Sequence, residues 1–166
     1  MSAATPAGPR AGIGYDRHRF APGRRLVLGG VELDCERGLE GHSDADVVTH
    51  AIIDALLGAA GLEDIGHQFP DTDERFRDAD SLELLRATAR LLSERGLVVS
   101  HVDATVVIEQ PAIAPARAEM CSRLAQALGV SAEQVSIKAT RGEGMGFVGR
   151  EEGAAAFAVA TVTSDR

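Results

Sequence analysis

The order of hydrophobic and polar positions predicts strands and helices in turn along the chain. Residues 12–20 have the pattern of a first strand, and two short apolar runs on either side of Gly29-Gly30 are typical of a hairpin with a two-residue turn. Apolar positions at helical spacing indicate three helices, and alternation with a period of two indicates later strands. The predicted helices run from Ser43 to 58–61, from Ser81 to Gly96 and through 118–128, and the later strands cover 98–109, 135–139 and 155–163.

Helices that separate strand pairs indicate an α+β fold, with helices on one face of a mainly antiparallel sheet. A length of 166 residues is typical of one domain. We expect a single domain over 12–163, preceded by a flexible N-terminal segment, 1–11, that is rich in Ala, Gly and Pro. Exposed apolar positions on the last predicted strand point to an oligomer.

Composition and charge exclude several classes of function. The formal net charge is −8, which argues against binding to nucleic acid or to an anionic membrane, because both require a positive field. No apolar run approaches the roughly 20 residues of a membrane span, and the first ten residues lack the apolar core of a signal peptide. The chain is therefore predicted to be cytoplasmic. An anionic substrate would have to be met by metal ions and a few local donors.

Two polar loops are candidates for function, and the first is about 18 residues long, a length at which a loop without secondary structure is more often functional than not. The first, 63–80, contains acidic and turn residues in 64–66 and 69–73, which suit hydrogen bonds to sugar hydroxyls. A solvated turn capped by Asp71 and Asp73 is the alternative. The second, 140–149, is rich in glycine and offers Glu143 to a hard cation, although its glycines may equally serve only the loop's shape.

Three residues have the pattern of a zinc site. Asp16 and His18 are two apart on a predicted strand and so share a face, and His50 lies in the first predicted helix. An Asp/His/His set leaves one zinc position open for substrate. Asp46 or Asp54, four residues either side of His50, could hold its second ring nitrogen. From spacing alone, a surface Asp–His pair and a structural helix histidine remain the alternative.

A second pattern indicates an anion site. His42-Ser43 comes directly before the predicted helix start, where free backbone N–H groups and the helix dipole favour phosphate. Ser43 with Asp46 resembles a capping box, so Ser43 serving only as an N-cap is the alternative. His67 and His101 have no partner pattern, and we assign neither of them a function.

Taken together, the motifs resemble the 2-C-methyl-D-erythritol 2,4-cyclodiphosphate synthase family. The resemblance covers nearly the whole chain, from about Gly12 to Thr163, and several long motifs occur in the family's order and spacing. These motifs are Gly14-Tyr15-Asp16-Arg17-His18, Gly41-His42-Ser43-Asp44-Ala45-Asp46, 47–50, 54–59, Asp64-Ile65-Gly66, Phe69-Pro70-Asp71-Thr72-Asp73 and Gly146-Phe147-Val148-Gly149-Arg150.

The resemblance implies an α+β homotrimer whose sheets face the three-fold axis and whose active sites lie between neighbouring subunits. Family members convert 4-diphosphocytidyl-2-C-methyl-D-erythritol 2-phosphate into 2-C-methyl-D-erythritol 2,4-cyclodiphosphate and CMP. The 2-phosphate attacks the β-phosphorus, so the enzyme is a phosphorus–oxygen lyase. The reaction belongs to the methylerythritol phosphate route to isoprenoid (terpenoid) precursors.

The resemblance also implies roles for individual residues. Asp16, His18 and His50 would bind Zn²⁺, and Glu143 would help to hold Mg²⁺ or Mn²⁺. His42 and Arg141 stand at the catalytic positions. The implied substrate-binding residues are Asp16, His18, His42, Ser43, Asp64, Gly66, Phe69, Asp71, Asp73, Ala114, Thr140, Glu143, Phe147 and Arg150. Phe147 and Arg150 would lie toward the three-fold axis, where family members can bind an isoprenoid diphosphate.

Three positions depart from the family pattern. Arg141-Gly142 replaces the usual Thr-Thr or Thr-Asn, Ala112 stands where Lys is common, and Arg17 replaces a smaller residue. Two other functions fit part of the pattern. A zinc-dependent phosphohydrolase would share the Asp/His/His set, and a non-catalytic trimer that binds isoprenoid diphosphates would use Phe147 and Arg150.

Overall fold

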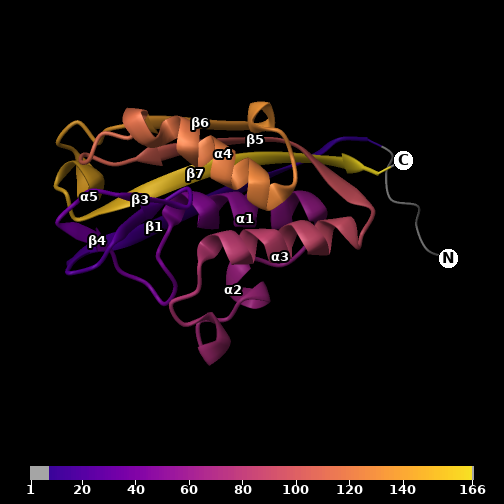
Figure 1. The fold of residues 1–166 in the computed structure, drawn as a ribbon, viewed down its shortest axis with the longest axis horizontal. Coiled ribbons are helices and arrows are strands. Elements are labelled where there is room, and N and C mark those ends of the chain that lie inside the picture. The colour runs from indigo at the N-terminus through magenta and orange to yellow at the C-terminus, as the bar shows by residue number, and fades with distance from the viewer. Residues whose placement is uncertain (1–7, 166) are drawn as a thin grey trace.

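A five-stranded sheet forms one layer of the computed structural model, which describes residues 8–165, and helices form the other (Figure 1). The strands of the sheet lie in the order β4-β1-β7-β5-β6, and β2 and β3 form a separate hairpin. The strands are β1 (Arg10–Pro22), β2 (Leu26–Leu28), β3 (Val31–Leu33), β4 (Arg37–Leu39), β5 (Leu97–Val107), β6 (Val135–Thr140) and β7 (Gly153–Ser164). The helices are α1 (Val47–Ala60), α2 (Ile65–Gln68), α3 (Ser81–Ser93), α4 (Arg117–Leu128) and α5 (Gly146–Gly149).

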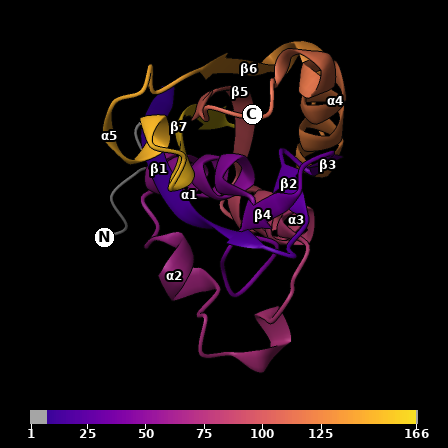
Figure 2. The same cartoon turned by 90° about the vertical axis from the view of Figure 1, so that its left-hand side faces the viewer.

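The prediction of an α+β fold with a mainly antiparallel sheet is confirmed. Strand β1 pairs antiparallel with β4 and β7, and β5 pairs antiparallel with β7. The exception is β5 with β6, which run parallel because α4 connects them as a crossover. The sheet is therefore mixed, and in end-on view it curls around α1 (Figure 2).

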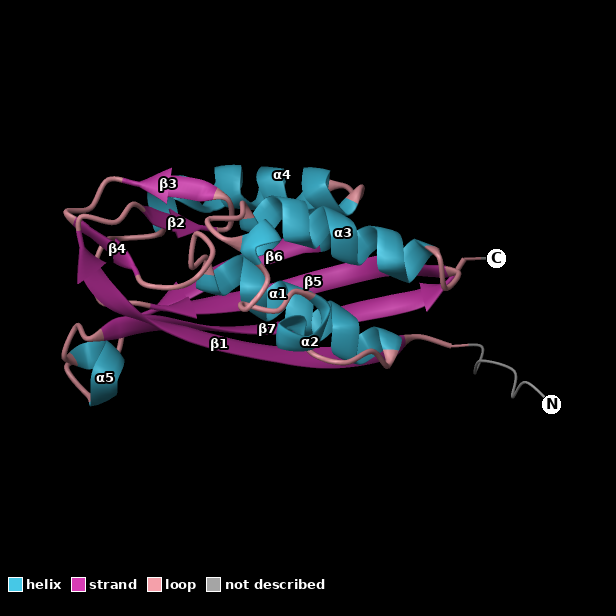
Figure 3. Cartoon of the chain, turned by 90° about the horizontal axis from the view of Figure 1, so that it is seen from below, coloured by secondary structure: helices cyan, strands magenta, loops and turns pink. Residues whose placement is uncertain are grey.

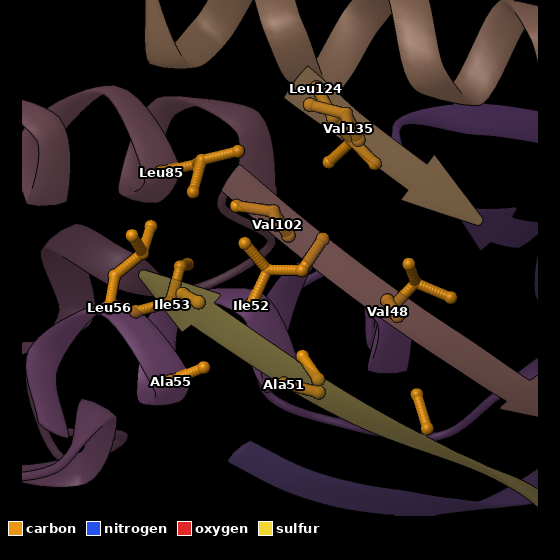
Figure 4. Packing of buried hydrophobic residues seen from close by; sticks show 14 of the residues in the cluster. Val48, Ala51, Ile52, Ile53, Ala55, Leu56, Leu85, Val102, Leu124 and Val135 are labelled. Atoms are coloured by element: carbon orange, nitrogen blue, oxygen red, sulfur yellow. The ribbon is translucent and has the colours of Figure 1, made fainter. Parts of the chain in front are cut away.

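Helix α1 lies directly on the inner face of the sheet, and small residues allow this close approach. A Cβ at Gly14 would lie 1.8 Å from the Ala51 carbonyl oxygen, and one at Gly12 would lie 2.1 Å from that of Ala55. The inner face of β7 is lined by alanines between 154 and 160. The apolar residues of α1 fill the space between β5, β7 and α3 (Figure 4). The backbone of β1 and the first turns of α1 are thereby fixed against each other.

The predicted start of the first helix is wrong by several residues. Asp46, not Ser43, caps α1, and its buried carboxylate accepts hydrogen bonds from Thr49 N (3.0 Å) and Oγ1 (2.7 Å). It also accepts from Gly29 N (2.9 Å) and Gly30 N (2.8 Å) in the β2–β3 turn. Burial and the nearby Asp44 charge raise the pKa of Asp46, although these donors oppose the shift. The tertiary contact with the hairpin selects Asp46 as the cap and leaves Ser43 in the preceding loop.

We expect Asp46→Ala to destabilise the fold severely. The substitution removes the helix cap and leaves the buried N–H groups of Gly29 and Thr49 and the half-buried N–H of Gly30 without acceptors, which should cost about 3 kcal/mol or more. Urea unfolding measures the loss. Asp80→Ala is the matched control, because Asp80 caps α3 from an exposed position and its removal should cost only about 1 kcal/mol. Equal losses for the two variants would contradict this account.

Other boundaries differ in detail. Strand β1 begins at Arg10, which pairs with Val162, so the last part of the predicted flexible segment belongs to the sheet, and 1–7 lie outside the described residues. The predicted loop 63–80 contains α2 and a 3₁₀ turn, Glu74–Phe76, and the glycine-rich loop contains α5. Helix α5 lies near β4, at the opposite end of the sheet from the start of β1 and the end of β7 (Figures 1 and 3).

Within residues 8–165 the structure contains no helix with the length and apolar character of a membrane span.

Candidate metal and substrate site

Three side chains from β1 and α1 converge on one point. Asp16 and His18 leave the same face of β1, and His50 projects from the first turn of α1, which packs on that strand. Asp16 Oδ2 lies 2.9 Å from His18 Nε2 and 3.1 Å from His50 Nδ1. Within the described part of the chain, this is the one group of three or more His, Cys, Asp or Glu residues whose ligand atoms all lie within 4.8 Å of one another. The geometry of the fold thus brings together the three predicted zinc ligands.

The electrostatics of this cluster are those of a cation site. Burial opposes ionisation of Asp16, but its contacts with His18 and His50 outweigh this and lower its pKa to about 2. Burial likewise opposes a charged His50, but the hydrogen bond and charge of Asp16 raise the pKa of that ring. The half-buried Asp16 carboxylate stays ionised, and its negative charge favours a positive charge on the neighbouring ring, so the cluster also favours a bound cation.

The donor set fits zinc on two counts. Two imidazole nitrogens and one carboxylate oxygen are ordinary zinc ligands, and three protein ligands leave one position open. In addition, His18 Nε2 is buried without a hydrogen-bond partner, because its contact with Asp16 lacks hydrogen-bond geometry. A buried ring nitrogen without a partner costs free energy, and a metal ion would satisfy it.

The pKa of Asp16 leads to a prediction for the metal-free protein. Because its pKa is lowered from 3.8 to about 2, Asp16 stabilises the fold above pH 3.8, and this contribution is lost as the pH falls through 2. The loss should amount to about 2 kcal/mol. Urea unfolding of chelator-treated protein between pH 5 and pH 2 measures it, with Asp16→Asn as the control. The same pH dependence in both proteins would contradict the assignment.

The second nitrogen of His50 has partners that the sequence did not predict. Nε2 lies 2.8 Å from Ser81 Oγ and 3.1 Å from Ser43 Oγ. The expected partners, Asp46 and Asp54, are both engaged elsewhere. Asp46 caps α1, and Asp54 accepts a hydrogen bond from Ile65 N at 3.0 Å, which fixes the start of α2. Their proposed role beside His50 is therefore wrong.

A cavity of about 320 Å³ opens beside the cluster. One wall consists of the cluster itself and the loop before α1, and the other comes from α2 and the following segment. Phe69 and Phe76 meet edge to face on that second wall, with ring centroids 5.5 Å apart. The lining residues are Tyr15, Asp16, His18, His42, Ser43, His50, Asp54, Ile65, Gly66, Phe69, Asp71, Phe76 and Leu84. The cavity thus combines a candidate metal site with polar and aromatic walls.

The cavity includes about half of the residues expected to bind substrate. From the two predicted segments it contains His42 and Ser43, and Gly66, Phe69 and Asp71. Asp64 and Asp73 are not in its lining. Asp64 caps α2 through His67 N, and Asp73 pairs with Arg75, whose hydrogen bonds lower the pKa of that carboxyl.

The remaining expected residues lie outside this cavity. Phe147 lines a second hollow of about 200 Å³ that shares His18 with the first. Arg150 pairs with Glu152 at 3.1 Å. The other four are exposed on the β5–α4 connection, the end of β6 and the loop that follows: Ala114, Thr140, Arg141 and Glu143. Sequence reasoning also missed cavity residues such as Phe76 and Leu84, because nothing in their local pattern distinguishes them from packing residues.

The fold and site define an α+β protein with an open Asp/His/His centre in the wall of a cavity sized for a small molecule. The chain belongs to the YgbB family, whose model matches residues 9–163. The predicted family is thereby confirmed, and the chain is assigned to the cyclodiphosphate synthases of the methylerythritol phosphate route to isoprenoid precursors.

Relatives and solved structures agree with this assignment. The chain is 59% identical to the 2-C-methyl-D-erythritol 2,4-cyclodiphosphate synthase of Rubrobacter xylanophilus over 155 residues, which are 92% of this chain and 93% of that protein. It is 62% identical over 149 residues, 90% of this chain, to the bifunctional enzyme IspD/IspF of Anaeromyxobacter dehalogenans, but spans only 38% of that longer protein. A Plasmodium falciparum IspF structure in complex with CDP superposes with a TM-score of 0.86 at 28% identity, over 98% of this chain and all of that one.

Proposed function

We propose that the chain converts 4-diphosphocytidyl-2-C-methyl-D-erythritol 2-phosphate into 2-C-methyl-D-erythritol 2,4-cyclodiphosphate and CMP, as a phosphorus–oxygen lyase. The observation that carries the proposal is the convergence of Asp16, His18 and His50 beside a cavity that also contains His42 and Ser43. A cation centre next to hydrogen-bond donors suits a substrate with several phosphate groups. The cytoplasmic location stays a prediction from the sequence.

The reaction needs alignment and charge neutralisation more than a strong base. The attacking phosphate is already anionic at neutral pH, so no proton has to be removed before attack. Zn²⁺ held by Asp16, His18 and His50, with Mg²⁺ or Mn²⁺ at Glu143, would supply positive charge that offsets the repulsion between the phosphates. With a net charge of −8, the chain needs such cations at the site.

The protein's own groups position the substrate in this scheme. His42 and Ser43 lie in the cavity wall beside the cluster, where their side chains can donate hydrogen bonds to a phosphate. His42 Nε2 is 3.4 Å from the Asp73 carbonyl, a contact that ties its ring to the opposite wall. The wall formed by Gly66, Phe69 and Asp71 would hold the methylerythritol, with Asp64 and Asp73 fixing the backbone turns behind it.

One chain provides only part of this proposed active site, and a homotrimer would complete it. Ala114, Thr140, Arg141 and Glu143, the proposed cytidine and phosphate residues, lie outside the cavity that contains the metal ligands. The outer face of the sheet carries large exposed apolar side chains: Ile13 is 72% exposed and Val159 is 47% exposed, and the two are paired across β1 and β7. Tyr15 and Phe157 form the next pair, with ring centroids 4.8 Å apart. Burial of this stripe against two further copies would bring one subunit's exposed loop to a neighbour's cavity.

Phosphorus NMR of the purified protein tests the reaction. We expect CMP and a cyclic diphosphate from the diphosphocytidyl substrate with Mg²⁺ present, and no turnover after chelation. Linear phosphates that incorporate solvent oxygen would instead establish a phosphohydrolase. If the substrate stays intact although the protein is folded and zinc-loaded, the result would support the alternative of a non-catalytic trimer that binds isoprenoid diphosphates through Phe147 and Arg150.

Arg141→Thr should retain at least part of the activity, because it restores a residue that is common in the family. Arg141 is exposed, and no side-chain hydrogen bond or ion pair of the described residues holds it, so the guanidinium is free to contact a phosphate. The change should raise KM more than it lowers kcat if Arg141 serves mainly to bind charge. Steady-state kinetics decide the point, and complete loss of turnover would show that Arg141 has become essential.

A further inference from the structure

A hydrogen-bonded chain leads away from the proposed metal centre through His50. Ser81, the first residue of α3, is fully buried, and its Oγ lies 2.8 Å from His50 Nε2. Ser81 is held in turn by Asp44, in the loop before α1. One Asp44 oxygen accepts from Ser81 N at 3.0 Å, and the other accepts from Ser81 Oγ. The chain thus runs from Asp44 through Ser81 to His50 and ends at Asp16.

The direction of these hydrogen bonds follows from the donors available. An ionised carboxylate has no hydrogen to give, so the single hydroxyl hydrogen of Ser81 goes to Asp44. Toward His50, Ser81 Oγ then acts only as an acceptor, so His50 Nε2 donates to it at 2.8 Å, and Ser43 Oγ is a second neighbour of Nε2 at 3.1 Å. Nδ1, 3.1 Å from Asp16 Oδ2, also faces an acceptor, so in the metal-free ring it donates to that carboxylate. A metal ion at this point would replace the Nδ1 hydrogen, and the ring would then be a neutral imidazole whose remaining hydrogen is on Nε2.

We propose that Ser81 and Asp44 are positioning residues of the metal centre, which fix the ring of His50 so that Nε2 holds the proton and Nδ1 faces the ion. The inference rests on the zinc site of the proposed function and adds the groups that orient one of its ligands. Outer partners of this kind set the tautomer and raise the basicity of a ligating histidine. They also connect the metal centre to α3, an element that supplies none of the three ligands.

Zinc affinity, measured by competition with a chromophoric chelator at fixed pH, tests the proposal. We expect Ser81→Ala to bind zinc about 10- to 100-fold more weakly than the unchanged protein. Asp44→Asn should also weaken binding, because an amide can donate to Ser81 and so reverse the hydrogen bond to His50. Thr88→Val is the matched control. Thr88 is a buried hydroxyl on the same helix, but it donates to the Leu84 carbonyl, so its variant should keep the original affinity.

Two further measurements separate the possible failures. If His50→Ala binds zinc as the unchanged protein does, the zinc site itself is wrong. If His50→Ala loses zinc while folded Ser81→Ala and Asp44→Asn retain full affinity, only the positioning role is overturned. Nitrogen NMR of the unchanged, zinc-loaded protein needs no variant to fold. We expect the His50 proton on Nε2, protected from exchange, and a proton on Nδ1 with zinc at Nε2 would overturn the proposal.

Discussion

Asp16→Ala is expected to abolish turnover and to release bound zinc while the protein remains folded. Asp16 Oδ2 contacts both His18 Nε2 and His50 Nδ1, and the removal of Asp16 takes away the only negative charge among the three ligands. We expect turnover to fall by at least about 10³-fold, which corresponds to about 4 kcal/mol of transition-state stabilisation. His50→Ala should behave in the same way.

Zinc content, turnover and circular dichroism are measured together on each variant. His67→Ala serves as the matched control, because His67 is exposed, pairs with the equally exposed Glu63 and has no predicted function. It should keep both zinc and activity. Full zinc occupancy in Asp16→Ala and His50→Ala would contradict their assignment as zinc ligands. Loss of the folded spectrum in Asp16→Ala would show that Asp16 is required for folding.

The two ligands on β1 could be predicted from local pattern, but the third could not be joined to them in that way. Alternation along a strand places Asp16 and His18 on one face without any knowledge of the fold. The distance from that face to His50 depends on how α1 packs on β1, which the glycines at 12 and 14 allow. Helix spacing alone carries no such information, so the resemblance to a family supplied what local periodicity lacked.

The start of α1 shows how tertiary contacts override a local rule. Both Ser43 and Asp46 are suitable capping residues, and the capping-box pattern favours Ser43. The backbone N–H groups of Gly29 and Gly30, distant in sequence, settle the choice because only the buried Asp46 carboxylate reaches them. Release of Ser43 from capping is what lets its hydroxyl approach His50. The same reasoning explains why Ser81, 31 positions from His50, was missed.

The residues predicted to bind the cytidine show a second limit of prediction from sequence, which concerns sites shared between subunits. Thr140, Arg141 and Glu143 were grouped with the metal ligands by resemblance, yet in one chain they lie outside the cavity that those ligands line. No pattern within a chain reveals which copy's cavity a loop completes. The exposed apolar stripe on β1 and β7 is a feature of the single chain that bears on this question.

Val159→Glu should therefore convert the proposed trimer into monomers and remove nearly all activity, although it changes no residue of the cavity. Val159 pairs with Ile13 in the exposed stripe, and a charge there would be buried in the trimer without a partner. The penalty is several kcal/mol per buried charge, and three-fold symmetry repeats it in every subunit. Light scattering coupled to gel filtration gives the mass, and the synthase assay gives turnover.

Ala118→Glu adds the same charge on an exposed position of α4 and should leave both mass and turnover unchanged. A zinc-binding measurement distinguishes the metal site, which one chain forms, from the complete active site, which the trimer would form. Because Asp16, His18 and His50 all come from one chain, monomeric Val159→Glu should still bind zinc while turnover is lost. An active monomer would show that one chain holds a complete site, and Thr140, Arg141 and Glu143 would then have to reach the cavity of their own subunit.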